Sequence, residues 1–303
     1  MIKGLAITPP VLGRISIGKV VERNGKRLPE KDDQFSITSQ IQNREGWVSH
    51  PLDESLRKGS NGKLRSIPIQ VLFDDPDLNL RAQYSLFDKT NGRPVCAGDG
   101  ENCKRHSDAG MQSLPCPSPE LCSFGKGLCK PYARLNVQIG EDDELGTFIF
   151  RTTGFNSIRT LTARLNYFSA VSGNVLSCLP LELRLRGKST TQSHRSAIYY
   201  ADITIRDGMT LDAAIAEAHT KREQRVQSGF DQIALDQAAR MGFGNGAFEE
   251  SEDEVPAVLE EFFPEDGDVT GMVTSTGTNT GISTLQSKLD SKVAVKSTRG
   301  AAS

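Results

Sequence analysis

The chain has 303 residues, enough for one large domain or two small ones followed by a tail. Its 36 Lys and Arg nearly balance its 38 Asp and Glu, giving a formal net charge of -2 that excludes a histone-like polycation. No apolar run reaches the roughly 18 residues of a membrane span, and the N-terminal apolar stretch is too short for a secretory signal. We therefore expect a soluble, cytoplasmic protein with no membrane partner.

Short runs rich in β-branched side chains, with alternating apolar and polar residues, predict strands in the first half of the chain. No βαβ rhythm separates these runs, so we expect a mainly antiparallel sheet. The predicted strands cover residues 14–21, 34–38, 66–73, 79–87, 134–139 and 147–151, the last two forming a hairpin around the polar segment 140–146.

Apolar residues recur at three- and four-residue steps from Ile158 to Val171, which predicts an amphipathic helix. Asn156 or Ser157 would cap its start, and Gly173 would end it. The remaining predicted elements are strands at 179–186 and 198–205, a helix from Thr210 or Asp212 to about Gln227, and a weaker helix over 230–241.

Five of the six cysteines lie between Cys96 and Cys129, in a stretch rich in Gly and Pro that leaves little helix or strand. A loop of this length needs something to fold around, and without an export signal a metal ion is favoured over disulfides. Reduced cysteines without metal remain a further alternative. The preferred tetrahedral set for one structural zinc ion is Cys96, Cys116, Cys122 and Cys129, with Cys103 spare and His106 as an alternative ligand.

Basic residues concentrate in 151–206, where eight of them stand against two acidic ones. A strand-to-helix turn at Gly154 lies between two of these arginines, so the helix N-terminus there is suited to a phosphate or a carboxylate, or is an ordinary joint. Together these side chains predict a surface for a nucleic-acid backbone or an acidic protein, unless they form only a solvated sheet face. The candidate residues are Arg151, Arg159, Arg164, Arg184, Arg186, Lys188 and Arg195.

The segment that follows is acidic, with ten acidic residues and no Lys or Arg from Glu249 to Asp268. A Thr- and Gly-rich stretch at 272–282 cannot bury enough surface to offset its ordering entropy, which predicts a flexible tail over 249–303. Val255–Phe263 is the exception, because four large apolar residues stand among the acids. It is either a solvated linker or a short motif that docks on a basic groove of this chain or of a partner.

The sequence thus predicts an α+β fold with a mainly antiparallel sheet and a few helices, an inserted cysteine-rich zinc-binding loop and a disordered acidic C-terminal tail. The core domain would span 1–248, with the insertion at 94–132 and a helical segment at 210–241; the tail would span 249–303.

Arrangements of nucleophile and base are absent from the sequence. The four histidines lie in no H-E-x-x-H or H-x-E context, no G-x-S-x-G occurs, and Gly187-Lys188-Ser189 lacks the earlier glycine of a phosphate-binding loop. Asp74, Asp75 and Asp77 surround a proline and indicate a turn. We therefore expect no enzymatic activity and no small-molecule substrate.

Three segments resemble a family of phage recombination directionality factors that act with large serine integrases. They are Gly13-Arg14-Ile15 with the strand around Phe35-Ser36-Ile37-Thr38, the cysteine-rich middle with Cys116-Pro117 and Cys122-Ser123-Phe124-Gly125, and Phe148 with Arg151–Ser157 at the start of a helix. The likeness covers roughly residues 10–205. It implies a non-enzymatic accessory protein that binds an integrase on DNA and biases it from integration towards excision.

These observations predict a regulator of DNA recombination in a phage or other mobile element, with a recombinase as partner and direct DNA binding left open. One alternative is a nucleic-acid-binding protein of phage replication or repair, whose acidic tail competes for its own basic face. A second is a metal-dependent hydrolase, which requires an open metal position and a carboxylate base.

Overall fold

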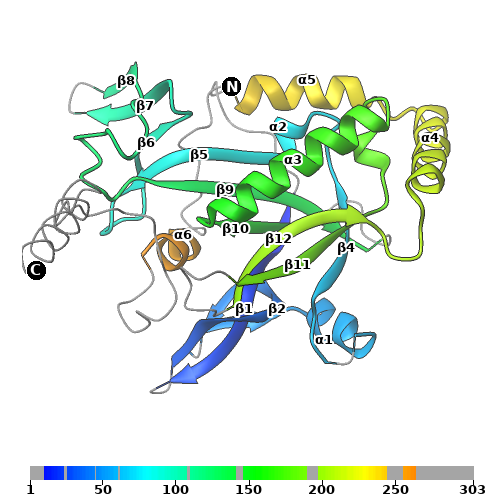
Figure 1. The fold of residues 1–303 in the computed structure, drawn as a ribbon, viewed down its shortest axis with the longest axis horizontal. Helices are drawn as coiled ribbons and strands as arrows, with labels where there is room; N and C mark the ends of the chain where they lie inside the picture. The colour runs from blue at the N-terminus through cyan, green and yellow to red at the C-terminus, as the bar shows by residue number, and fades with distance from the viewer. Residues whose placement is uncertain are drawn as a thin grey trace, which may run out of the picture. The chain divides into compact units, whose positions relative to one another are not determined.

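The structure is a computed structural model that describes residues 10–23, 26–44, 46–60, 62–107, 110–140, 146–189, 197–243 and 255–263 (Figure 1). All of these belong to one compact unit, which spans Met1–Gly271. No helix among them is long and apolar enough to cross a membrane. The predicted boundary at residue 248 therefore falls inside this unit, and most of the predicted tail lies outside the described residues.

Twelve strands form one sheet: β1 (Val11–Arg23), β2 (Lys26–Asn43), β3 (Gly46–Ser49), β4 (Ser66–Val71), β5 (Leu80–Phe87), β6 (Pro94–Gly98), β7 (Asn102–Ser107), β8 (Gly110–Pro115), β9 (Lys130–Ile139), β10 (Thr147–Thr152), β11 (Leu181–Ser189) and β12 (Ala197–Ile205). The helices are α1 (Pro51–Lys58), α2 (Pro76–Asn79), α3 (Phe155–Val171), a 3-10 turn η1 (Leu176–Cys178), α4 (Leu211–Gln227), α5 (Gln232–Phe243) and α6 (Val255–Phe262).

The sheet follows the order β3-β2-β1-β10-β9-β5-β6-β7-β8, and β4 joins β9 to the β11–β12 hairpin. Only the β1–β10 pair is parallel among the described strands, which confirms the prediction of an α+β fold with a mostly antiparallel sheet and few helices. The predicted hairpin of 134–139 and 147–151 is present as β9 and β10. A bulge breaks the register of β1 with β2 near Gly18, whose φ of 126° favours glycine.

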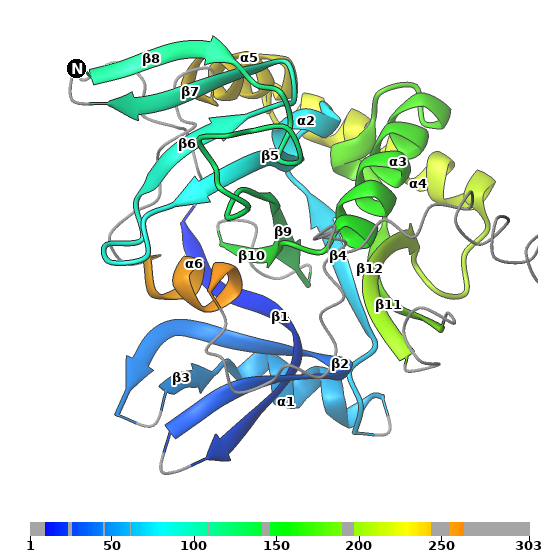
Figure 2. The same cartoon turned by 60° about the vertical axis from the view of Figure 1, so that its left-hand side comes forward.

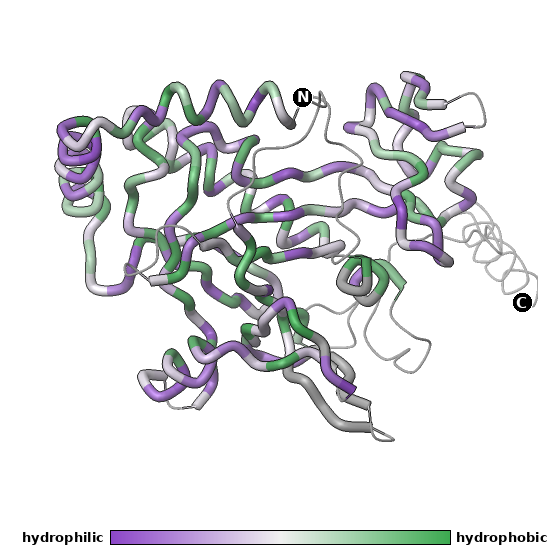
Figure 3. The backbone as a smooth tube through the Cα atoms, turned by 180° about the vertical axis from the view of Figure 1, so that it is seen from behind, coloured by the Kyte–Doolittle hydropathy of each residue, from purple (hydrophilic) through white to green (hydrophobic). Residues whose placement is uncertain are grey.

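The main core lies between one face of this sheet and the apolar side of α3. Leu161 and Leu165 are fully buried there, as the helical periodicity predicted, and β9 supplies its odd-numbered side chains. Hydrophobic and hydrophilic colours alternate along the central strands in Figure 3, whereas α4 is largely hydrophilic. The fully buried strand residues include Phe35, Ile37, Ile67, Ala133, Leu135, Val137, Leu181, Leu183, Ala201 and Ile203.

The structure departs from the sequence-based elements at four places. The cysteine-rich segment contains strands β6, β7 and β8, although its Gly and Pro content indicated little regular structure. Gly154, and not Asn156 or Ser157, precedes the first turn of α3, and it makes no side-chain cap. Pro51–Lys58 forms the unpredicted helix α1, and Pro76–Asn79 forms the short helix α2 within the predicted turn.

Helix α6 is the structured exception within the predicted tail. Its residues Val258 and Phe262 are fully buried and pack with Phe87 and Tyr132 of the sheet. Residues 255–263 are therefore packed on the sheet and are not a solvated linker, but the buried side chains meet the aromatic Phe87 and Tyr132 and not the predicted basic groove.

Candidate functional site

The cysteine-rich insertion brings thiols from separate strands together. Gly98 of β6 pairs with Cys103 of β7, and Cys96, Cys103 and Cys116 share one small cluster with Leu86. A Cβ atom added at Gly98 would lie 2.7 Å from the Cys103 Cβ and 3.0 Å from the Cys116 Sγ. Glycine at this position therefore lets the three cysteine-bearing segments approach one another.

The two remaining cysteines of the insertion, Cys122 and Cys129, lie near this cluster. Burial raises the pKa of Cys129 to about 12, with further contributions from the nearby Cys96, Cys122, Cys116 and Cys103 thiols. Burial and the neighbouring Cys96 raise the pKa of Cys103 to about 11. The Cys129 thiol thus lies within electrostatic reach of the four other cysteines of the insertion.

Cys103 and His106 lie on opposite faces of β7 and differ in burial. Cys103, set aside as the spare ligand, is buried beside Cys96. His106 is exposed, and strand alternation places it on the opposite face of β7. The Arg105 guanidinium lies over the Phe124 ring at 3.8 Å and has its pKa raised by a hydrogen bond to Cys96, although burial opposes that shift.

All six cysteines are free thiols. Among the described residues, no three His, Cys, Asp or Glu side chains already stand in an arrangement that could hold a metal ion. Cys178 lies apart, in the main core, where it accepts a contact from Arg225 Nη1 at 3.6 Å.

Four of the predicted basic residues lie on or beside the β11–β12 hairpin, each with a polar partner. Arg164 and Arg186 both bind the buried Asp202, at 3.1 Å and 3.2 Å. Arg184 binds Glu182 at 2.6 Å, and Lys188 donates to the Asn156 Oδ1 at 2.8 Å. The carboxylates offset much of the positive charge that the residue count indicated.

The other three predicted basic residues are separate from this group. Arg159 is exposed on the first turns of α3, and Arg195 lies outside the described residues. Arg151 is on β10, where it is 8% exposed.

Arg151 belongs instead to a row of arginines that crosses the sheet. It pairs in register with Arg134 of β9, which pairs in register with Arg81 of β5. Registered neighbours on adjacent antiparallel strands point to the same face, so the three guanidinium groups share the face opposite the main core. Each has a contact within the chain. The sequence shows one arginine in each of these three strands, and only the strand register aligns them.

A carboxylate occupies the turn before α3. Glu261 of α6 accepts hydrogen bonds from the Thr153 backbone N at 2.9 Å and from the Thr153 Oγ1 at 3.2 Å. The positive end of the helix dipole favours an anion here. The chain's own acidic segment thus places a carboxylate on the Thr153 N–H and hydroxyl that precede α3.

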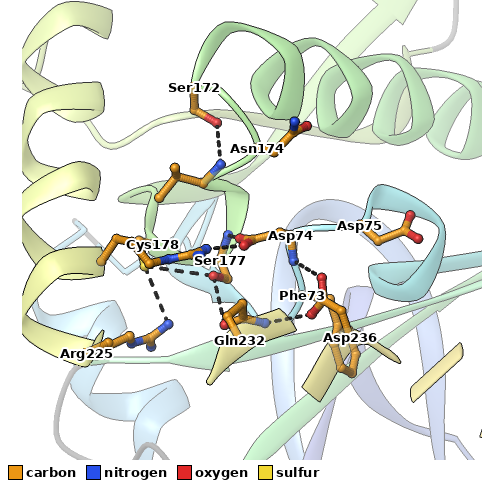
Figure 4. A network of polar contacts seen from close by, with 12 residues as sticks. Phe73, Asp74, Asp75, Ser172, Asn174, Ser177, Cys178, Arg225, Gln232 and Asp236 are labelled. Atoms are coloured by element: carbon orange, nitrogen blue, oxygen red, sulfur yellow. Dashed lines mark hydrogen bonds and ion pairs between the residues drawn. The ribbon is translucent and has the colours of Figure 1, made fainter. Parts of the chain in front are cut away.

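Asp74 lies in a polar network that fastens α4 and α5 to the sheet (Figure 4). Its carboxylate forms an ion pair with Arg222 and accepts from the Ser177 backbone N at 2.9 Å. Its own backbone N donates to Asp236 Oδ2 at 3.1 Å, and burial raises the pKa of Asp236. Gln232 donates to Asp236 Oδ1 at 2.7 Å. Asp75 caps α2, as expected of turn chemistry, whereas Asp74 joins distant segments.

Comparison with known families adds the remaining evidence. The model of the Gp3-like family, described as recombination directionality factor-like, matches residues 12–206. Neither the curated proteins nor the solved structures include a significant match to the chain. The matched range takes in the sheet from β1 to β12, the cysteine-rich insertion and α3. Since it covers more than half of the sequence, the chain belongs to the Gp3-like family of recombination directionality factor-like proteins.

Proposed function

We propose that this protein is a non-enzymatic regulator of DNA recombination in a phage or other mobile element, which binds a recombinase and shifts it from integration towards excision. The family match over residues 12–206 carries this proposal. The sequence offers no nucleophile-and-base arrangement, and the Asp74 carboxylate is engaged in fastening helices.

Binding energy alone is sufficient for such a switch. A factor that binds one arrangement of the recombinase–DNA complex more tightly than the other shifts the equilibrium by the difference in binding free energy. About 1.4 kcal/mol changes the ratio tenfold, and about 5.5 kcal/mol reverses a 99:1 preference. A protein without catalytic groups can supply differences of this size through binding alone.

A recombination assay with purified components tests the proposal. A large serine integrase from the same phage or mobile element is incubated with integration substrates or with excision substrates, with and without the factor. We expect excision products to rise and integration products to fall when the factor is present. Unchanged product direction, together with no binding to the recombinase in a pull-down, would refute the proposed function.

The cysteine-rich insertion supports a second, structural element of the proposal. We infer that four of its five cysteines hold one zinc ion, which stabilises the insertion. Support comes from the convergence of Cys96, Cys103 and Cys116 around Gly98, and from free thiols in place of disulfides. Cys122 and Cys129 lie in the adjoining loop, where a Cβ at Gly125 would lie 2.9 Å from the Cys129 Cβ. Four protein ligands would leave no open position, so this ion would be structural.

Metal analysis of single Cys→Ser variants tests the zinc proposal and identifies the ligands. We expect about one zinc ion per wild-type chain, with loss of metal in four of the five insertion variants and retention in the fifth. Cys178→Ser is the matched control, because this buried cysteine lies in the main core. A wild-type protein that binds no zinc when prepared in reducing, zinc-containing buffer would overturn the inference.

A further inference from the structure

Helix α6 is an eight-residue segment whose buried side chains Val258 and Phe262 pack against the sheet. Phe262 packs edge-on against Phe87 and Tyr132, with ring centroids 4.8 Å and 6.2 Å apart, and Val258 is buried with it. Both views in Figures 1 and 2 draw α6 beside β9 and β10. The sheet therefore presents an aromatic pocket that accepts two apolar side chains spaced four residues apart.

Two polar contacts flank this pocket, one to the C-terminal end of α6 and one to its Glu261 carboxylate. The Lys130 Nζ donates to the Phe262 carbonyl at 2.8 Å and lies 5.3 Å from its ring centre. This is a favourable place for a cation, at the C-terminal end of α6. Glu261 reaches in the other direction, to the Thr153 N–H before α3. The site thus contacts three features of α6: the apolar side chain of Phe262, the carboxylate of Glu261 and the carbonyl at the C-terminal end of the helix.

Charge complementarity extends the site beyond these contacts. Tyr132 and Arg134 are two residues apart on β9, so they share a face, and Arg134 continues the row of Arg81 and Arg151. The segment around α6, from Glu249 to Asp268, carries ten acidic residues and no basic one. A basic sheet face beside an aromatic pocket matches this composition.

The docking of α6 on the sheet is open to competition from another helix. An isolated helix shorter than about 12 residues is marginal in water, so α6 depends on docking for its helical structure. Because α6 belongs to the same chain as the sheet, it competes with a partner helix at an effective concentration that does not depend on the protein concentration. A helix of a partner replaces α6 where the ratio of its concentration to its dissociation constant exceeds the same ratio for the tethered segment.

We propose that the pocket formed by Phe87, Lys130, Tyr132 and Thr153, with the adjoining arginine row, is a binding site for an amphipathic acidic helix. Helix α6 occupies it in the free protein, and a helix of the recombinase occupies it in the complex. The second statement rests on the proposed function. A nucleic-acid backbone fits the arginines but supplies no apolar side chain for the aromatic pocket, so the observations favour a protein helix.

A peptide exchanged in trans tests the site without the recombinase. The probe is a fluorescent synthetic peptide of residues 251–267, and its anisotropy is measured with full-length protein. The double variant Val258→Asp, Phe262→Ala releases the tethered helix, so we expect it to bind the peptide at least ~10-fold more tightly than wild type. Phe262→Ala alone provides a milder release, and thermal melting reports whether each variant remains folded.

Matched controls locate the binding. Ile233→Asp, on an exposed position of α5, should leave peptide affinity at the wild-type level. Adding Tyr132→Ala to the released variant, or Phe262→Ala to the peptide, should abolish the gain. Equal peptide affinity in wild type and in both folded released variants would overturn the proposal. So would a gain in affinity for a labelled DNA duplex without a gain for the peptide.

Adding the recombinase tests the partner separately. We expect it to displace the labelled peptide from the released variant. Failure to displace a peptide that binds as expected would refute the recombinase helix as occupant while leaving the helix-binding site established. The recombination assay independently reports whether the proposed function holds.

Discussion

Asp33 on β2 shows how a single carboxylate ties separate segments together. It accepts hydrogen bonds from Lys63 and Arg65, which precede β4. These two cations hold the pKa of Asp33 well below its usual range. The ionised form is therefore favoured in the folded state, and the contact links the β1–β2 hairpin to the central sheet.

Replacing Asp33 with Asn should lower the free energy of unfolding at pH 7 but have less effect in acid. A carboxylate with a lowered folded pKa contributes stability that is fully present above its unfolded value near 4. That contribution is lost as pH falls through the lower folded pKa, so the two unfolding curves should converge with falling pH. Urea unfolding at pH 7 and near pH 2 measures this.

The control is Glu54→Gln, which removes an exposed ion pair with Lys58. Exposed pairs contribute about 0–1 kcal/mol, so this variant should unfold much like wild type at both values. An Asp33→Asn effect that is equal at both pH values would contradict the assigned pKa direction.

Gly98 is the residue on which close approach within the cysteine-rich insertion depends. In Gly98→Ala, the new Cβ would stand 2.8 Å from the Asn102 carbonyl oxygen and 2.7 Å from the Cys103 Cβ. Because backbone cannot yield as a flexible side chain does, we expect a destabilisation of about 1–3 kcal/mol. Faster proteolysis within 94–132 would report it.

Gly59→Ala is the matched control, because its Cβ would make an ordinary 3.6 Å contact with the Leu56 carbonyl oxygen. Wild-type proteolysis of Gly98→Ala would show that the insertion tolerates the added methyl group.

At the scale of elements, periodicity predicted α3, β9, β10, β11 and β12 because one face of each meets the core. The strands β6–β8 were missed because their side chains pack in a small cluster of cysteines around Leu86. Helix α6 was left open because its apolar residues find partners on β5 and β9, more than 120 residues earlier in the chain. The secondary structure of such segments is determined by their tertiary contacts and not by the local sequence pattern.

For the candidate site, too, the sequence predicted some groupings of residues and missed others. Cysteine spacing predicted a zinc site of Cys96, Cys116, Cys122 and Cys129, and that site stays a prediction. The fold clusters Cys96 and Cys116 with Cys103, the cysteine that the sequence analysis set aside as spare. Counting charges grouped Arg151 with Arg164 and Arg186, but the structure pairs the latter two with Asp202 and aligns Arg151 with Arg134. Strand register determines which charges become neighbours, and it cannot be counted from composition.

Asp74→Asn should loosen α4 and α5 from the sheet. The change removes the ion pair with Arg222 and weakens the hydrogen bond from the Ser177 N–H. We expect a loss of about 1–3 kcal/mol, the range for leaving a partly buried polar partner unsatisfied. Hydrogen exchange should accelerate in residues 211–243 more than in β9.

Asp77→Asn is the control for this network, because Asp77 is exposed on the neighbouring helix α2. Uniform acceleration across the molecule, or no acceleration in α4 and α5, would show that Asp74 does not fasten these helices.

At the scale of the whole molecule, one sheet supports three surfaces with different chemistry. These are the cysteine-rich insertion on β6–β8, the paired charges on β11–β12, and the arginine row with α6 across β5, β9 and β10. The fold thus separates the cysteine-rich insertion from the face that carries the arginine row and α6. An accessory factor requires such a surface because its effect depends on differential binding.

Titration of the factor against a fixed recombinase concentration, with both substrate arrangements, tests this account most directly. The account predicts that excision rises while integration falls, and that the effect saturates at about one factor per recombinase subunit, as expected for a ligand that shifts populations. A complete switch at about one factor per hundred recombinase subunits would indicate turnover and contradict a non-enzymatic role; so would equal changes in both directions.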